Sequence, residues 1–116
     1  MTKEITDPKV IKPPQAMLFR LDLNLNVTEV SNNFFKLLGY TKKETIGKSI
    51  LTTIQKEDRS KVKSIIDNLL TSKSQVVTYE VRKIKKDNSE IWVRAFFQIL
   101  ETEKNKKEIL ITCEDI

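Results

Sequence analysis

Few side chains in this sequence have the chemistry of a catalytic site. The chain has no histidine, which excludes serine–histidine and cysteine–histidine hydrolases, a histidine-ligated metal or haem, and the phosphorylated histidine of a sensor kinase from these residues. Two carboxylate pairs, Glu57 with Asp58 and Glu101 with Glu103, have the residue types of general acid–base catalysis. We expect both pairs to be solvated, because they stand at a predicted helix start and at a predicted turn. We therefore predict that this domain is not an enzyme.

The single cysteine indicates the redox environment of the chain rather than a catalytic role. Cys113 has no second cysteine for an internal disulfide, which is typical of a reducing cytosol. It alternates with Ile109 and Ile111, so we expect its thiol to point into the packed face of a strand as a small core residue. From there it would not reach a cofactor held among helices.

Two glycines bracket the most informative segment. Gly39 follows a short run with helical spacing and can close that helix in the left-handed backbone conformation. Thr41 and Glu44 then form a Thr-x-x-Glu capping box that opens a second short helix, which Gly47 can end. Because these are the only glycines, no glycine-rich phosphate-binding motif fits the sequence. The segment predicts two short helices in close succession.

Further motifs follow in a fixed order along the chain. They are Val30–Asn32, Lys56–Arg59, Tyr79–Arg82, Lys86–Ser89 followed by Trp92-Val93, and Glu114–Ile116. Together with the segment from Leu38 to Lys48, they resemble the signature of the PAS family of sensory domains. The resemblance covers residues 16–116 and leaves residues 1–15 as a leader.

Two turns lack the glycine that the family commonly has there. Leu25 and Asn88 stand at these positions, and Ser31 replaces an asparagine that is frequent in the family. Because asparagine tolerates the left-handed conformation, we expect Asn24, Asn26 and Asn88 to preserve the turns.

The hydrophobic pattern predicts an α+β fold. Strand-like apolar patterns cover residues 17–22, 27–30, 75–85, 90–100 and 108–114. Short helices are predicted over residues 32–38 and 41–46, with a further turn at 51–54 and a longer amphipathic helix over 57–70. The PAS resemblance implies that the five strands form one antiparallel sheet, with the helices inserted between the second and third strands.

The fourth predicted strand is apolar on both of its faces. Phe96 and Phe97 are adjacent, so on a strand they must point to opposite sides. One side packs against the helices, and we expect the other to leave an exposed patch of the kind that marks a partner site. The candidate outer-face residues are Leu18, Trp92, Phe96 and Leu110. We expect a homodimer or a flanking helix on this face.

The space between the sheet and the helices has two interpretations. A domain of this size has little interior to spare, so its apolar residues can simply fill the core. The other interpretation is a cavity for a small organic ligand, with Tyr40, Tyr79, Thr52 or Thr53 as polar contacts. The candidate pocket residues are Phe35, Leu38, Tyr40, Ile54, Ile66, Leu69, Tyr79 and Phe97, with Phe34 and Ile50 in the same wall.

No cofactor is expected. The flavin-binding photosensors of the PAS family carry Asn-Cys-Arg after the short helices, whereas this chain has Ser49-Ile50-Leu51-Thr52 there. Covalent flavin chemistry is therefore not expected, and the absence of histidine argues against haem. No metal site is predicted.

The net charge of +5 comes from dispersed lysines, which we expect at turns and on exposed helix faces. Nucleic-acid binding is not predicted, because such proteins gather arginine, lysine and aromatic residues on one face. No apolar run is long enough to cross a bilayer, so we expect no membrane contact and a cytoplasmic location. The dispersed lysines are Lys42, Lys43, Lys61, Lys63, Lys83, Lys85, Lys86, Lys104, Lys106 and Lys107.

The PAS resemblance implies a sensory domain cut from a larger signalling protein, such as a sensor histidine kinase or a cyclic-dinucleotide enzyme. In the family, the position of Asp115 commonly leads into a helical linker to the effector, so Asp115 is the candidate signal exit. The alternative is a dimerisation or protein-interaction module without a ligand. An enzyme is disfavoured, because no pair of a nucleophile and a base is present.

Overall fold

The computed structural model describes residues 16–33, 37–71, 76–101 and 106–116. The strands form one five-stranded antiparallel sheet with the order β2-β1-β5-β4-β3. They are β1 Met17–Leu21, β2 Val27–Val30, β3 Val76–Ile84, β4 Glu90–Glu101 and β5 Lys107–Asp115. The predicted α+β fold is confirmed, whereas the predicted leader, residues 1–15, lies outside the described residues.

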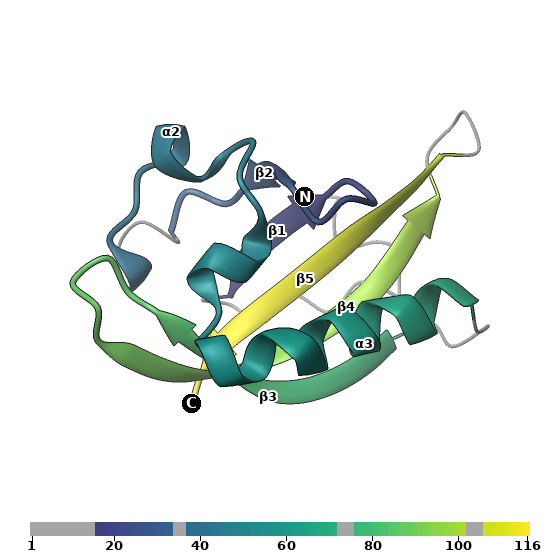
Figure 1. Cartoon of the computed structure of the whole chain (residues 1–116). Coiled ribbons are helices and arrows are strands. Elements are labelled where there is room, and N and C mark those ends of the chain that lie inside the picture. The colour runs from purple at the N-terminus through teal and green to yellow at the C-terminus, as the bar shows by residue number, and fades with distance from the viewer. Residues whose placement is uncertain (1–15, 34–36, 72–75, 102–105) are drawn as a thin grey trace.

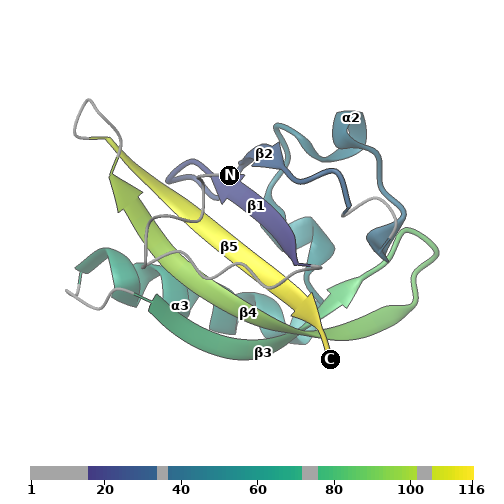
Figure 2. The ribbon, with the colours of Figure 1, turned by 180° about the vertical axis from the view of Figure 1, so that it is seen from behind.

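The helical elements follow β2 in the chain. They are α2 Lys42–Thr45, the 3₁₀ turns η2 Ile50–Thr53 and η3 Lys56–Asp58, and α3 Arg59–Thr71. The long helix α3 runs across one face of the sheet (Figure 1), and the view from behind shows the opposite face of the strands (Figure 2). The predicted long helix between the second and third strands is therefore confirmed.

The core lies between α3 and the middle of the sheet. Phe19 of β1, Ile111 of β5 and Phe97 of β4 are paired across three strands and are all buried. Helix α3 buries its apolar stripe against this face, as its spacing predicts. The buried stripe consists of Val62, Ile65, Ile66 and Leu69.

The turn between β1 and β2 differs from its prediction. The carboxylate of Asp22 accepts hydrogen bonds from the backbone N–H groups of Asn24 and Asn26, at 2.9 and 3.0 Å. The left-handed residue is Leu25, with φ of 70°, and neither asparagine takes that role. Leu25 packs against the core and its carbonyl accepts a hydrogen bond from Ile50 N at 2.8 Å. These contacts offset the backbone strain.

The capping box, the conformations of the two glycines and the second hairpin turn agree with their predictions, whereas residues 34–36 of the predicted helix over 32–38 lie outside the described residues. The Thr41 side chain accepts a hydrogen bond from Glu44 N at 3.2 Å, and Thr41 N donates one to the Glu44 carboxylate at 2.9 Å, which completes the capping box. Gly39 and Gly47 both have positive φ, at 88° and 87°. In the second hairpin the left-handed residue is Asn88, with φ of 73°, as predicted. Within the described ranges, no helix combines the length and apolar character that crossing a bilayer requires.

Candidate functional site

A polar pair lies inside the apolar core. Lys83 of β3 is fully buried, and its Nζ donates a hydrogen bond to Thr53 Oγ1 of η2 at 3.0 Å. The hydroxyl of Thr53 in turn donates to the carbonyl of Ile50 at 2.9 Å, so towards Lys83 it acts as the acceptor. The Lys83 Nζ also lies 4.3 Å from the centre of the Phe19 ring. These groups form the interior polar site, defined as Lys83, Thr53 and the Phe19 ring.

The position of Lys83 corrects the prediction that the lysines are dispersed over the surface. Lys83 stands two residues after Val81 on the same strand, so its side chain shares the helix-facing side of the sheet with that buried valine. Burial lowers the pKa of its amine. Strand alternation in the sequence already placed Lys83 on the same side as Val81. A lysine, however, is normally assigned to the solvent-exposed face.

Cys113 lies on the same side of the sheet. Its thiol is fully buried, as predicted, and burial raises its pKa. The Lys83 amine opposes this rise through its charge. A cysteine with a raised pKa is a poor nucleophile. The observed burial is that of a small core residue.

The candidate pocket residues other than Tyr79 divide into three groups. Leu38, Ile54, Ile66, Leu69 and Phe97 are buried in the core beside Ile50. Tyr40 is half-buried against that core, and its hydroxyl donates to the carbonyl of Ile84 at 3.1 Å. Phe34 and Phe35 lie outside the described residues.

Tyr79 and Thr52 do not belong to the interior, contrary to prediction. Tyr79 is 41% exposed, because β3 is the edge strand, and the Lys61 Nζ lies 5.5 Å from its ring centre. Thr52 is exposed, and its hydroxyl donates to the carbonyl of Ser49. Of the four proposed polar contacts, Thr53 alone is fully buried and Tyr40 is half-buried.

The outer face of the sheet is less open than predicted. Trp92 is 51% exposed and carries the Arg82 guanidinium 5.3 Å from its ring centre. Leu18 and Phe96 are half-buried, and they flank Thr112 in the strand register. Leu110 is buried, which corrects its assignment to an exposed patch. The exposed aromatic surface is therefore centred on Trp92.

Charged groups surround Trp92 on this outer face. Arg94 contacts the carboxylates of Glu114 at 2.9 Å and Glu80 at 3.7 Å. Arg82 extends from the neighbouring strand, where it pairs with Trp92 in the register. An aromatic ring with a polar rim is typical of a protein contact surface.

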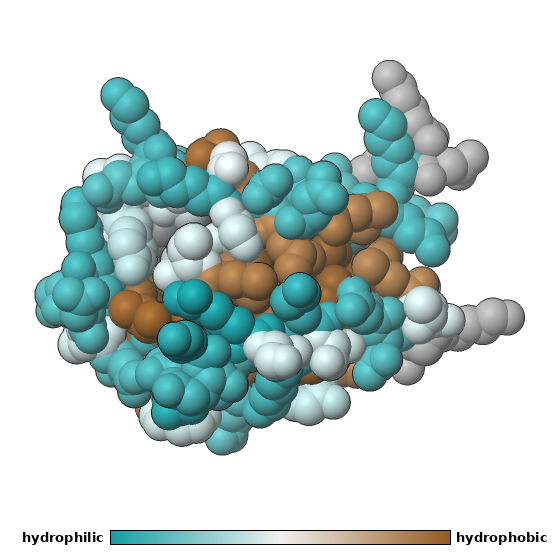
Figure 3. All heavy atoms as spheres, in the orientation of Figure 1, coloured by the Kyte–Doolittle hydropathy of each residue, from teal (hydrophilic) through white to brown (hydrophobic). Residues whose placement is uncertain are grey.

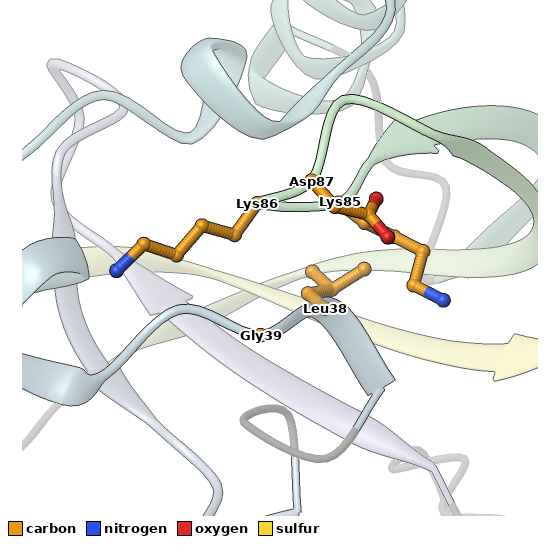
Figure 4. A pocket seen from close by; sticks show the side chains of 5 residues that line it. All are labelled: Leu38, Gly39, Lys85, Lys86 and Asp87. Atoms are coloured by element: carbon orange, nitrogen blue, oxygen red, sulfur yellow. The ribbon is translucent and has the colours of Figure 1, made fainter.

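A surface pocket lies where Leu38 and Gly39 meet the β3–β4 turn. It has a volume of about 340 Å³ and is lined by Leu38, Gly39, Lys85, Lys86 and Asp87. Figure 4 shows Lys86 extending to one side of this pocket, and Lys85 and Asp87 to the other. The Lys86 amine contacts the Glu44 carboxylate at 2.6 Å and lowers the pKa of Glu44 to about 2. Lys86 and Asp87 thus already have polar partners within the chain, Glu44 and Ser89.

The candidate signal exit is the last residue of β5. Asp115 is exposed and pairs with Val93 in the sheet register. The following residue, Ile116, donates its backbone N–H to the carbonyl of Trp92 at 3.3 Å. The end of the central strand therefore lies beside the exposed tryptophan. Among the described residues, no cluster of three or more acidic or cysteine side chains could hold a metal ion.

The family is decided by comparison with known proteins. A family model described as PAS domain matches residues 14–116. The chain belongs to the PAS domain family. In this PAS domain the interior polar site lies between the sheet and the helical elements, and Trp92 lies on the opposite face of the sheet. No curated protein matches the chain.

Solved structures show the same fold. The PAS domain of an HTR-like protein from Haloarcula marismortui is 23% identical, with a TM-score of 0.77 over 90% of this chain and 84% of that one. A PAS domain from Colwellia psychrerythraea is 20% identical, with a TM-score of 0.78 over 87% of this chain and 86% of that one. Drosophila melanogaster Cycle PAS-B, with bound ethylene glycol, is 16% identical, with a TM-score of 0.77 over 86% of this chain and 99% of that one.

Proposed function

We propose that this PAS domain is the sensory module of a larger signalling protein. A small organic ligand in the interior changes the state of a C-terminal effector, such as a histidine kinase or a cyclic-dinucleotide enzyme. The domain itself is not an enzyme, carries no haem or covalent flavin, binds neither nucleic acid nor membrane, and works in the cytoplasm.

One observation carries the ligand proposal. The hydrogen bond between Lys83 and Thr53 places polar groups in the middle of an apolar core. Small-molecule sites are mostly apolar, with a few placed polar groups that orient the ligand. Structures of Cycle PAS-B with bound ethylene glycol and with bound glycerol are consistent with small polar molecules in this fold.

The sheet offers a route from the interior to the effector. β5 is the central strand, and its alternate residues Ile109, Ile111 and Cys113 belong to the core. The same strand ends at the exposed Asp115. A ligand that displaces core side chains would thus act on the strand that leads out of the domain.

Native mass spectrometry of the protein purified from cells tests this proposal. We expect a non-covalent organic adduct that is lost on denaturation. Ile66→Phe, which adds volume to the core, should reduce the adduct, whereas Lys63→Met on the exposed side of α3 should not. Absence of any adduct, combined with no binding in a small-molecule screen by NMR, would contradict the ligand proposal.

The exposed Trp92 favours a second candidate function. A ligand-free PAS domain that dimerises, or binds a flanking helix, would use the outer face of the sheet. Exposed tryptophan beside arginine is frequent at the centre of protein interfaces. Sedimentation over a range of concentrations distinguishes this function, because it predicts self-association without an interior ligand.

A further inference from the structure

The Lys83 amine has an incomplete set of partners. Among the described residues its one hydrogen bond is to Thr53 Oγ1, and the Phe19 ring centre lies 4.3 Å from the amine. The ion pairs among the described residues leave Lys83 without a carboxylate. A protonated lysine carries three N–H donors, so the charged form would have donors with no acceptor in the part of the chain that the structure describes.

This arrangement is costly when the amine is charged. Burying an ammonium group without an anion carries a large desolvation penalty, and a single hydroxyl does not compensate for it. The charged form would therefore need an anionic acceptor. No described residue supplies it from β1, β5 or η2, which contribute the Phe19 ring, the Cys113 thiol and the Thr53 hydroxyl to this region.

The interior polar site lies beneath a short segment of chain. Ile54, the residue after η2, forms a β-bridge with Lys83, and Gln55 N donates to the carbonyl of Arg82 at 2.9 Å. Residues 50–55 therefore lie beside the end of β3, and the hydrogen bond from Ile50 N to the Leu25 carbonyl, at 2.8 Å, also joins them to the β1–β2 turn. Figure 1 shows this segment directly before α3, on the helix side of the sheet. Figure 3 shows apolar atoms at the surface on the same side.

We propose that Lys83 and Thr53 form a recognition site for the carboxylate of a small organic acid. This inference rests on the proposed function, because it places the ligand in the interior of the PAS domain. The carboxylate accepts hydrogen bonds from the Lys83 amine and supplies the negative charge that the core lacks. Because the amine has no exposed surface in this structure, the ligand must be small and residues 50–55 must move to admit it.

Binding of the anion is coupled to a proton. Burial favours the neutral amine in the free protein. The bound carboxylate favours the ammonium form, so the complex takes up one proton from solvent. The Cys113 thiol, the titratable group facing Lys83 from β5, stays neutral because its pKa is raised. Affinity for the anion should therefore fall about tenfold per pH unit above the pKa of Lys83 in the free protein.

Propanoate and its neutral analogue propanamide test this site. Titration of the isotope-labelled protein, followed by NMR, should give saturable shifts for the backbone of residues 50–55 and 83 with propanoate. Propanamide should bind at least tenfold more weakly. Lys83→Met should weaken propanoate binding at least tenfold, and Thr53→Val should also weaken it, whereas Lys63→Met is the matched charge-removing control on the surface.

The outcomes separate this inference from the proposed function. Equal propanoate binding by the wild type and Lys83→Met would overturn the carboxylate site. If propanamide or an alcohol instead bound the interior with no dependence on Lys83, the ligand-sensing function would stand and the carboxylate site would fall. The pH dependence in the wild-type protein is a second measurement that does not require a variant to fold. A pH-independent affinity for propanoate would also contradict the site.

Discussion

The carboxylate of Asp58 accepts three hydrogen bonds from Arg82, from its backbone N at 3.0 Å, its Nε at 3.1 Å and its Nη2 at 3.0 Å. These bonds attach the end of η3, directly before α3, to the edge strand β3. The prediction that the Glu57–Asp58 pair is solvated is therefore wrong for Asp58, because Arg82 binds it in a bidentate manner. The guanidinium that binds Asp58 also lies over Trp92, so one arginine joins the helix side of the domain to its outer face.

Asp58→Asn should lower the stability of the domain at neutral pH. The hydrogen bonds from Arg82 are the main cause of the lowered pKa of Asp58, so their stabilisation is present above the ordinary pKa of this carboxyl group. It is lost as the pH falls through the lowered pKa in the folded state. Urea midpoints of the wild type and Asp58→Asn should therefore differ at pH 7 and converge in acid. A constant difference at all pH values would contradict this assignment.

Lys83→Met should stabilise the ligand-free domain by about 1–3 kcal/mol at neutral pH, because it removes a buried amine with one hydrogen bond. The unfolded chain takes up a proton below the ordinary lysine pKa of 10.5, whereas the folded protein, whose Lys83 pKa is lowered, does not. Wild-type stability therefore rises with pH between the lowered pKa and 10.5, and the advantage of Met shrinks. Chemical denaturation from pH 6 to pH 10 checks this. Destabilisation by Met at every pH would show that the amine is well accommodated.

Substitutions at Gly39 and Gly47 separate two causes of lost stability, backbone strain and steric contact. Both have positive φ, but a Cβ at Gly39 would lie 3.3 Å from the Lys86 Cβ, whereas a Cβ at Gly47 meets nothing within 4 Å. Gly39→Val should cost about 1–3 kcal/mol, and Gly39→Asn should cost less, because asparagine tolerates this conformation.

Gly47→Ala is the matched control for Gly39→Ala. Gly47→Ala should lower the stability less, since it introduces backbone strain but no contact with Lys86. Denaturation midpoints of the four variants give the comparison. Equal stabilities of Gly39→Val and the wild type would exclude the conformation assigned to Gly39.

The exposed Trp92 should mediate self-association. Trp92→Ser should shift a concentration-dependent dimer to monomer and weaken the association at least tenfold, because aromatic and arginine side chains dominate interface energies. Sedimentation velocity measures this, with Tyr79→Ser as the control, since Tyr79 is also exposed but lies on the helix-facing side. A wild-type protein that stays monomeric at every concentration would rule out the homodimer.

The purified domain should be colourless. It has no histidine to ligate haem, and its one cysteine is buried with a raised pKa. An absorption spectrum after gel filtration checks this prediction. A visible band with one chromophore per chain would disprove it.

The sequence by itself determined the features that depend on neighbouring residues. The capping box of Thr41 and Glu44 closes within one helical turn, and the amphipathic period of α3 requires only that some apolar surface be available. The strands, their antiparallel arrangement and the PAS family followed from motifs in a fixed order. The capping box, the helical period and the strand alternation are each encoded over a short stretch, whereas the antiparallel arrangement was implied only by the PAS resemblance over residues 16–116.

The tertiary structure decided which side chains are buried where the local sequence pattern allowed either burial or exposure. Alternation places Lys83 on one side of β3, but only the contacts of its amine with Thr53 of η2 and with the Phe19 ring make it an interior residue. Leu25 adopts a left-handed conformation because its contacts with Ile50 and the core offset the strain. Leu110 is buried and Trp92 exposed, although both lie on the outer face. Burial depends on groups brought together from distant parts of the chain, so a local pattern does not fix it.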